Sequence, residues 1–190
     1  TIMEAYDAGQ RIFGESRVQE LVVKQAELPD DIEWHFVGGL QRNKVKQIAP
    51  FISLIHSVDS ERLMREIDKQ GAANNRVIPC LLQIHIAEED TKSGFTPDEC
   101  RELLSNGTWK EYPRVQLSGV MGMATFTDNK EQVRDEFRQL KSLFDEWKSA
   151  YFSDIPAFKE VSMGMSDDHP LAIEEGSTMV RLGTVLFGER

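Results

Sequence analysis

Short apolar segments alternate with amphipathic helical segments along the 190 residues of the chain. The longest apolar segment, 77–86, is almost continuously apolar, which is typical of a parallel strand buried on both faces. In 130–150 the apolar residues from Val133 to Trp147 recur every three or four positions, which predicts a helix with one packed face. Strands that alternate with helices through short connections predict a parallel β/α architecture.

The expected strands are 11–13, 33–37, 51–56, 77–86, 115–121, 161–163 and 178–182. The expected helices are 1–8, 41–48, 97–104, 130–150, a segment that follows the turn Gly14-Glu15-Ser16 and runs to residue 28, and two that begin at the caps Asp59 and Ser166. The sequence shows no internal repeat, low-complexity segment or linker. A single domain over 1–190 is therefore expected, slightly shorter than a full barrel of about 200 residues.

The amino-acid composition limits the binding partners and the cellular location that can be expected for this protein. Lys and Arg number 22 and Asp and Glu 32, so the formal net charge is −10 and no basic run is present. This disfavours nucleic acid and anionic membranes as partners, and no apolar span of about 18 residues predicts a transmembrane helix. Cys80 and Cys100 lack metal-ligand spacing, so no metal site is expected and a reduced cytoplasm is the simplest location.

The last two expected strands end in small residues. Ser162 and Gly164 lie at the end of the first, and Gly183 and Thr184 follow the second. Backbone N–H groups without a side chain in the way, together with hydroxyl groups, suit a phosphate. In (β/α)8 barrels the loops after strands seven and eight frequently form such a phosphate site, so these four residues are candidate phosphate ligands.

These segments also carry a family resemblance. SMGMSDD at 162–168 and GSTMVRLGTVLFGER at 176–190 are accompanied by AYDAGQRIFGESRVQE at 5–20, WHFVGGLQRNK at 34–44, IHSVDS at 55–60, LLQIHIAEEDTKSGF at 81–95 and LSGVMGMAT at 117–125. In this order they resemble the pyridoxal phosphate homeostasis proteins, single-domain relatives of the alanine racemase barrel. The resemblance implies a (β/α)8 TIM barrel of the alanine racemase N-terminal domain type. It also implies a non-catalytic carrier or regulator of vitamin B6 that binds pyridoxal 5′-phosphate (PLP).

The resemblance places Arg181 against the nitrogen of the PLP ring. Arg181 alternates with Val180 and Leu182, so its side chain is expected to point into the barrel. Because a guanidinium only donates hydrogen bonds, it would keep that nitrogen unprotonated and the ring a weak electron sink. The alternative is a salt bridge from Arg181 to Asp167 or Glu189.

Other positions allow two interpretations. Ser16 stands where the family usually has an Asn that faces the cofactor, and it also suits a helix N-cap. Lys44 and Lys92 match family positions near the site, but both also suit solvated surface lysines. His35, in a strand, suits a packed or hydrogen-bonded histidine as well as a functional one.

The family lysine that forms the Schiff base lies on a first strand, in a segment resembling AVSKTKP, which precedes residue 1 here. The expectation is therefore a barrel without its first strand and the helix before it, in which covalent attachment of PLP through that lysine is not available. The neighbouring strands, 11–13 and 178–182, would then have open edges that favour self-association.

Two other classes of function remain open at this stage. One is a PLP-dependent amino-acid racemase, although related racemases take an opposing acid/base from a second domain for which this chain has no residues. The other is a barrel enzyme for a phosphorylated metabolite, which should place paired carboxylates or a lysine on inner strand ends. No such group is evident in the sequence.

Overall fold

The computed structural model describes residues 1–89 and 93–188. Within these residues, seven parallel strands form one sheet, and they neighbour one another in chain order. They are β1 (Ile12–Glu15), β2 (Glu33–Phe36), β3 (Leu54–Val58), β4 (Ile78–Gln83), β5 (Val115–Met121), β6 (Glu160–Met165) and β7 (Met179–Arg181).

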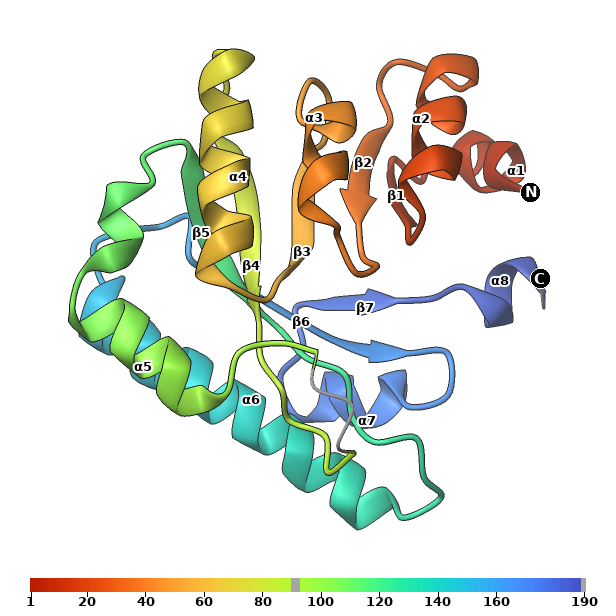
Figure 1. Cartoon of the computed structure of the whole chain (residues 1–190). Helices are drawn as coiled ribbons and strands as arrows, with labels where there is room; N and C mark the ends of the chain where they lie inside the picture. Colours follow the sequence, from red (N-terminus) through yellow and green to blue (C-terminus); the bar gives the residue numbers. More distant parts are fainter. Residues whose placement is uncertain (90–92, 189–190) are drawn as a thin grey trace.

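Helices connect consecutive strands on the outside of the sheet (Figure 1). The α-helices are α1 (Ile2–Asp7), α2 (Val18–Glu27), α3 (Val45–Ile48), α4 (Glu61–Ala73), α5 (Pro97–Ser105), α6 (Lys130–Tyr151), α7 (His169–Glu174) and α8 (Thr184–Phe187). They are accompanied by the 3-10 helices η1 (Arg42–Lys44) and η2 (Thr108–Glu111).

The sheet curls into a nearly closed barrel, as the sequence predicts. Figure 1 shows β7 and β1 on either side of an opening, and within the described residues these two strands are not paired. The parallel strands, the outer helices and the chain-order neighbours confirm the β/α barrel expected from the alternating segments.

Apolar side chains pack on both sides of the strands. The larger cluster fills the space between strands and helices and includes Phe13 and Trp34, whose ring centroids are 6.2 Å apart. A smaller cluster of Leu54, Leu81 and Met121 fills part of the barrel interior. Because side chains two apart on a strand share a face, His56 lies on the same interior face as Leu54, further toward the carboxyl end of β3. On β3 the interior face therefore changes from apolar at Leu54 to polar at His56.

Several element boundaries differ from the sequence expectation. Gly14 and Glu15 belong to β1 instead of a turn, because the Glu15 carboxylate is buried against Lys24 of α2. Helix α4 is capped by Ser60, whose hydroxyl accepts a hydrogen bond from the Leu63 N–H, and not by Asp59.

Helix α7 begins later than expected. Asp168 is its N-cap residue instead of Ser166, and the Asp168 carboxylate accepts a hydrogen bond from the Met165 N–H at 2.7 Å. That bond holds 166–168 in a turn between β6 and the helix. The apolar segment 185–187, expected only as a final apolar piece, lies in the short helix α8.

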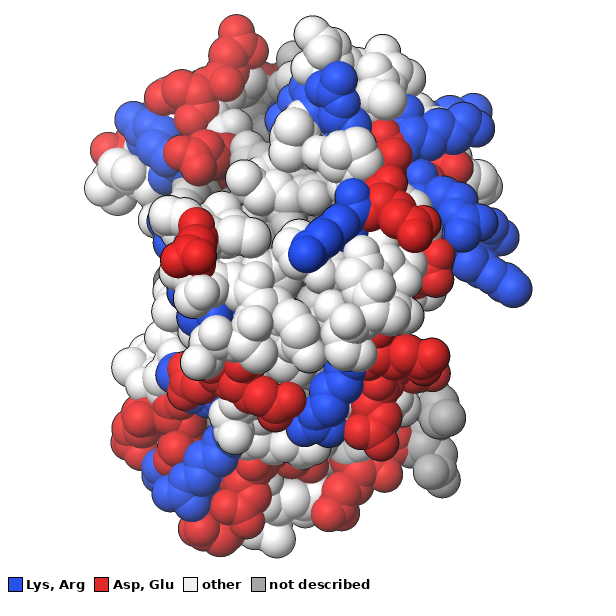
Figure 2. Space-filling model, turned by 90° about the vertical axis from the view of Figure 1, so that its left-hand side faces the viewer, with Lys and Arg blue, Asp and Glu red and all other residues white. Residues whose placement is uncertain are grey.

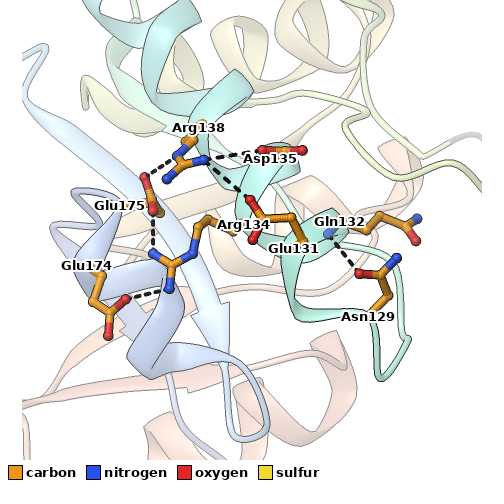
Figure 3. A network of polar contacts seen from close by, with 8 residues as sticks. All are labelled: Asn129, Glu131, Gln132, Arg134, Asp135, Arg138, Glu174 and Glu175. Carbon is orange, nitrogen blue, oxygen red and sulfur yellow. Dashed lines mark hydrogen bonds and ion pairs between the residues drawn. The ribbon is translucent and has the colours of Figure 1, made fainter.

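Ion pairs fix α7 against α6 (Figure 3). Arg134 of α6 contacts Glu174 at 2.7 Å and Glu175 at 2.5 Å, and Arg138 contacts Glu175 at 3.0 Å. The hydrogen bond from Arg134 lowers the pKa of Glu175; burial opposes this shift, and the hydrogen bond from Arg138 adds to it. The two arginines thereby offset the unfavourable position of two carboxylates at the carboxyl end of α7.

The surface carries charges of both signs. On the face in Figure 2, acidic and basic side chains surround a central area in which uncharged residues predominate. Among the described residues, no helix is long and apolar enough to cross a membrane.

Candidate functional site at the barrel mouth

The loops after β6 and β7 meet at the carboxyl end of the barrel. Met165 is the register partner of Arg181, and beyond this pair the Ser166 hydroxyl accepts a hydrogen bond from the Val185 N–H at 3.3 Å. From the sequence, Ser166 was expected only as the N-cap of a helix. Its hydroxyl instead joins the two loops in which the phosphate ligands were expected.

The two candidate glycines of these loops have different environments. Gly164 has a φ of +99°, and a Cβ there would lie 2.6 Å from the Ala172 Cβ, so α7 packs directly on it. Gly183 has no atom within 4 Å of the position that a Cβ would take, and it is exposed together with Thr184. The fold therefore requires glycine at 164, whereas the backbone at 183 is open to an approaching ligand.

Arg181 points inward, as the alternation along β7 predicts. Its Nη1 donates to the Ser162 Oγ at 2.6 Å, and its Nη2 donates to the Gly122 carbonyl oxygen at 3.2 Å. Burial lowers the pKa of Arg181 to about 10, and the Asp168 carboxylate partly opposes that shift. The guanidinium therefore remains a cation near neutral pH. The alternative salt bridge to Asp167 does not form among the described ion pairs, and Glu189 lies outside the described residues.

The Ser162 hydroxyl lies in the barrel interior and is not exposed at the mouth. It is fully buried, and its hydroxyl contacts the Arg181 guanidinium and the His56 Nδ1, the latter at 2.8 Å. These contacts direct the side chain into the barrel interior, away from the meeting point of the two loops at Ser166 and Val185. The expected role of Ser162 as a direct phosphate ligand remains a prediction, and the geometry favours a role through Arg181.

His56 and His35 extend this contact across the barrel. The His56 Nε2 lies 3.0 Å from the His35 Nδ1, and both side chains are buried. Burial lowers the pKa of His35 to about 4. Burial, with the charges of His35 and Arg181, places the pKa of His56 well below its usual value. His56 was not singled out from the sequence, although its alternation with Ile55 and Ser57 carries the same inward signal as that of Arg181.

A second group of candidates surrounds a surface pocket at the ends of β1 and β2. The candidates Ser16 and Lys44 both line it, and Gly39 also forms part of the pocket wall. The N-cap residue of α2 is Arg17, so the interpretation of Ser16 as the helix N-cap is wrong. Gly38 explains how this loop reaches Ser16, because a Cβ at Gly38 would lie 2.2 Å from the Ser16 carbonyl oxygen. Lys92, the other candidate lysine, lies outside the described residues.

The described residues offer neither a metal centre nor a lysine on the inner wall. No group of three His, Cys, Asp or Glu side chains there is arranged to hold a metal ion. The described lysines lie in helices, except Lys159, which precedes β6. The charged group at the mouth that both sequence and structure indicate is Arg181, flanked by exposed backbone at Gly183 and Thr184.

Comparison with known proteins identifies the family of this chain. Residues 1–190 match the family described as alanine racemase, N-terminal domain, so the chain is a parallel β/α barrel protein of that class. A relative from Aquifex aeolicus (strain VF5), named pyridoxal phosphate homeostasis protein, is 44% identical over 190 residues, which cover 100% of this chain and 81% of the relative. This chain belongs to the pyridoxal phosphate homeostasis protein family.

Solved structures agree with this assignment. PipY of Synechococcus elongatus PCC7942 without PLP has a TM-score of 0.89 at 38% identity, covering 98% of this chain and 86% of PipY. PipY with PLP bound has a TM-score of 0.85 at the same identity and coverage. An alanine racemase of Clostridium difficile 630 has a TM-score of 0.72 at 13% identity, covering 97% of this chain and 47% of the racemase, which shows a shared fold alone.

Proposed function

We propose that this chain binds PLP at the barrel mouth and acts in PLP homeostasis as a carrier or regulator, without catalysing a reaction. The observation that carries the proposal is the position of the Arg181 cation, held by Ser162 and Gly122 beside the loops that Ser166 joins. The family and the PLP-bound structure of PipY support this ligand.

The residues present suit the two polar ends of PLP. We assign the phosphate to the open backbone of Gly183, the Thr184 hydroxyl and the loop of Ser166. Gly164 allows the turn after β6, and Ser162 acts indirectly by holding Arg181. For the ring nitrogen, Arg181 supplies a donor that is already oriented by two hydrogen bonds. We also assign to the site Ser16, which lines the pocket at the ends of β1 and β2.

A carrier role follows from what faces the ligand. A guanidinium has no proton acceptor and holds its proton at neutral pH, so it leaves the ring nitrogen neutral and the ring a weak electron sink. The tyrosines of the chain serve elsewhere, since the hydroxyl of Tyr6 donates to Asp31, that of Tyr112 donates to Glu61, and Tyr151 ends α6. None of the tyrosines is therefore placed to act as the opposing acid/base of racemase-like chemistry.

The test of carrier against enzyme combines binding with proton exchange. PLP titrated into the unmodified chain should change its absorbance saturably, while free amino acids in deuterated water should keep their α-protons. In Arg181→Glu, a carboxylate would permit a protonated ring nitrogen, so any exchange should increase while PLP binding weakens. Arg65→Glu, the same charge reversal on the exposed face of α4, is the control. Rapid exchange by the unmodified chain would favour the racemase-like enzyme.

The mode of attachment is separately testable. Because no described lysine lies in a strand, we propose that this chain binds PLP without a covalent bond to the family lysine. Borohydride reduction with PLP followed by peptide mapping should give only substoichiometric labelling spread over surface lysines. One lysine labelled stoichiometrically, Lys44 or Lys92 included, would contradict this proposal and identify the attachment point.

The surroundings of the protein are also part of the proposal. The net charge of −10 supports the absence of nucleic-acid partners. Cys80 and Cys100 are both free and buried, which supports a cytoplasmic location. The unpaired edges of β1 and β7 support self-association of this chain.

A further inference from the structure

Four polar side chains form one continuous chain of contacts across the barrel interior. Arg181 of β7 contacts Ser162 of β6 at 2.6 Å, Ser162 contacts His56 of β3 at 2.8 Å, and His56 contacts His35 of β2 at 3.0 Å. Ser162, His56 and His35 are all buried. The contacts connect β6 and β7 with β2 and β3 through the barrel interior. Backbone hydrogen bonds join only strands that are neighbours in the sheet.

The direction of these hydrogen bonds follows from the donor at one end. The Arg181 Nη1 only donates, so the Ser162 oxygen accepts from it. The Ser162 proton then needs an acceptor, and the remaining partner that the described residues offer is the His56 Nδ1. A buried hydroxyl proton without an acceptor would cost about 1–3 kcal/mol, so Ser162 donates to His56.

This direction fixes the tautomers of both histidines. With its Nδ1 accepting, a neutral His56 carries its proton on Nε2 and donates it to the His35 Nδ1. A neutral His35 then also carries its proton on Nε2. Burial holds the pKa of both rings below the usual histidine value, so both are neutral near pH 7.

We propose that His56 and His35 are positioning residues that hold Ser162, and through it Arg181, in the orientation that receives the nitrogen of the PLP ring. Because both imidazoles are neutral, they orient Arg181 through Ser162 without forming an ion pair with it, and the guanidinium keeps its positive charge. A carboxylate in the place of His56 would draw the guanidinium into a salt bridge. The inference rests on the proposed function for its ligand, although its hydrogen-bond direction is a property of the protein alone.

The first test uses the unmodified chain without PLP. Long-range proton–nitrogen correlation spectra of the 15N-labelled protein near pH 7 should show His35 and His56 with unprotonated Nδ1 and protonated Nε2. A protonated Nδ1 on His56 would reverse the direction of the Ser162 bond and overturn the inference. This measurement stands whether or not the chain binds PLP.

The second test breaks the chain of contacts at His56. His56→Leu removes the acceptor, and we expect PLP affinity to fall about tenfold or more and the absorbance of bound PLP to shift, because Arg181 is no longer fixed. His56→Asn keeps an acceptor close to the Nδ1 position and should restore most of the affinity. Ser57→Ala is the matched control, since Ser57 is the next residue of β3, is equally buried, and has no hydrogen-bond partner within the described residues.

The outcomes separate the inference from the proposed function. If the unmodified chain does not bind PLP, the proposed function fails. The tautomers of His35 and His56 still test the direction of the hydrogen bonds from Arg181 to His35. If it binds and the His56→Leu variant, folded by circular dichroism, binds PLP equally well with the same spectrum, the positioning role is wrong. If His56→Leu does not fold, the tautomer of His56 in the unmodified protein decides, and a protonated His56 Nδ1 would refute the role.

Discussion

Arg181, the last residue of β7, is oriented by a hydrogen bond of 2.6 Å to the buried hydroxyl of Ser162 on the neighbouring strand β6. Because the Ser162 hydroxyl is neutral, it orients the Arg181 guanidinium without neutralising it. The positive charge at the barrel mouth therefore remains available to a ligand. This relationship links the floor of the proposed site to the interior of the barrel, and it makes the site sensitive to residues that a ligand does not touch.

Replacing Ser162 with Ala should destabilise the protein by about 1–3 kcal/mol, because the His56 Nδ1 and the Arg181 Nη1 would each lose a buried partner. Urea unfolding near neutral pH measures the change. Ser118→Ala is the matched control, since the Ser118 hydroxyl is also buried in a strand but donates only to the Gln116 carbonyl of its own strand. Equal stabilities of the two variants would show that the Ser162 contacts contribute little.

The free energy of unfolding should also fall as the pH is lowered from 6.5 to about 4, between the pKa of a free histidine and that of His35 in the fold. The pKa of His35 is about 4 in the fold against 6.5 for a free histidine, so between these values the unfolded chain binds more protons. The free energy of unfolding should therefore be about 2 kcal/mol smaller near pH 5 than near pH 7 from His35 alone, with no further loss from this group below about 4.

His35→Gln removes the titrating group and provides the comparison. The difference in unfolding free energy between pH values near 7 and 5 should shrink in this variant, while the contribution of carboxylates stays common to both proteins. An unchanged pH dependence would mean that His35 titrates normally and is not held neutral by the barrel interior.

The fold was predictable because its signals are local and repetitive. The strand at 115–121 was expected with the bounds that β5 has, and the inward direction of Arg181 followed from alternation along β7. The contact of Ser162 with His56, behind Arg181, was not predictable, because these two residues are 106 positions apart in sequence and meet only in the folded barrel. Ser166 was misassigned as a cap because Asp168, two residues later, makes the turn instead.

Self-association of this chain is expected at the opening between β1 and β7. Both edges are unpaired within the described residues, and the apolar side chains of Ile12, Val185 and Leu186 are 43%, 59% and 63% exposed. Sedimentation over a range of concentrations should show dimers or larger species that Leu186→Lys weakens. Val23→Lys, at an exposed apolar position of α2, should have no such effect. A monomer at every concentration would contradict the expectation.

The two candidate glycines of the phosphate site should respond differently to one added methyl group. Gly164→Ala should lower the free energy of unfolding by about 1–3 kcal/mol, because residue 164 has a φ of +99° and its Cβ would lie 2.6 Å from the Ala172 Cβ. Gly183→Ala should change that free energy by less than about 0.5 kcal/mol, since no atom lies within 4 Å of its added methyl group.

The same methyl group at Gly183 would stand in the open space that we assign to the phosphate. PLP affinity should therefore fall about tenfold in Gly183→Ala, the cost of about one hydrogen bond that the ligand can no longer form. Inorganic phosphate should compete with PLP for the unmodified protein, and less effectively for Gly183→Ala. Unchanged affinity for both ligands in a stable Gly183→Ala variant would place the phosphate elsewhere on the barrel, whereas a loss of stability without a loss of affinity would assign Gly183 to the fold alone.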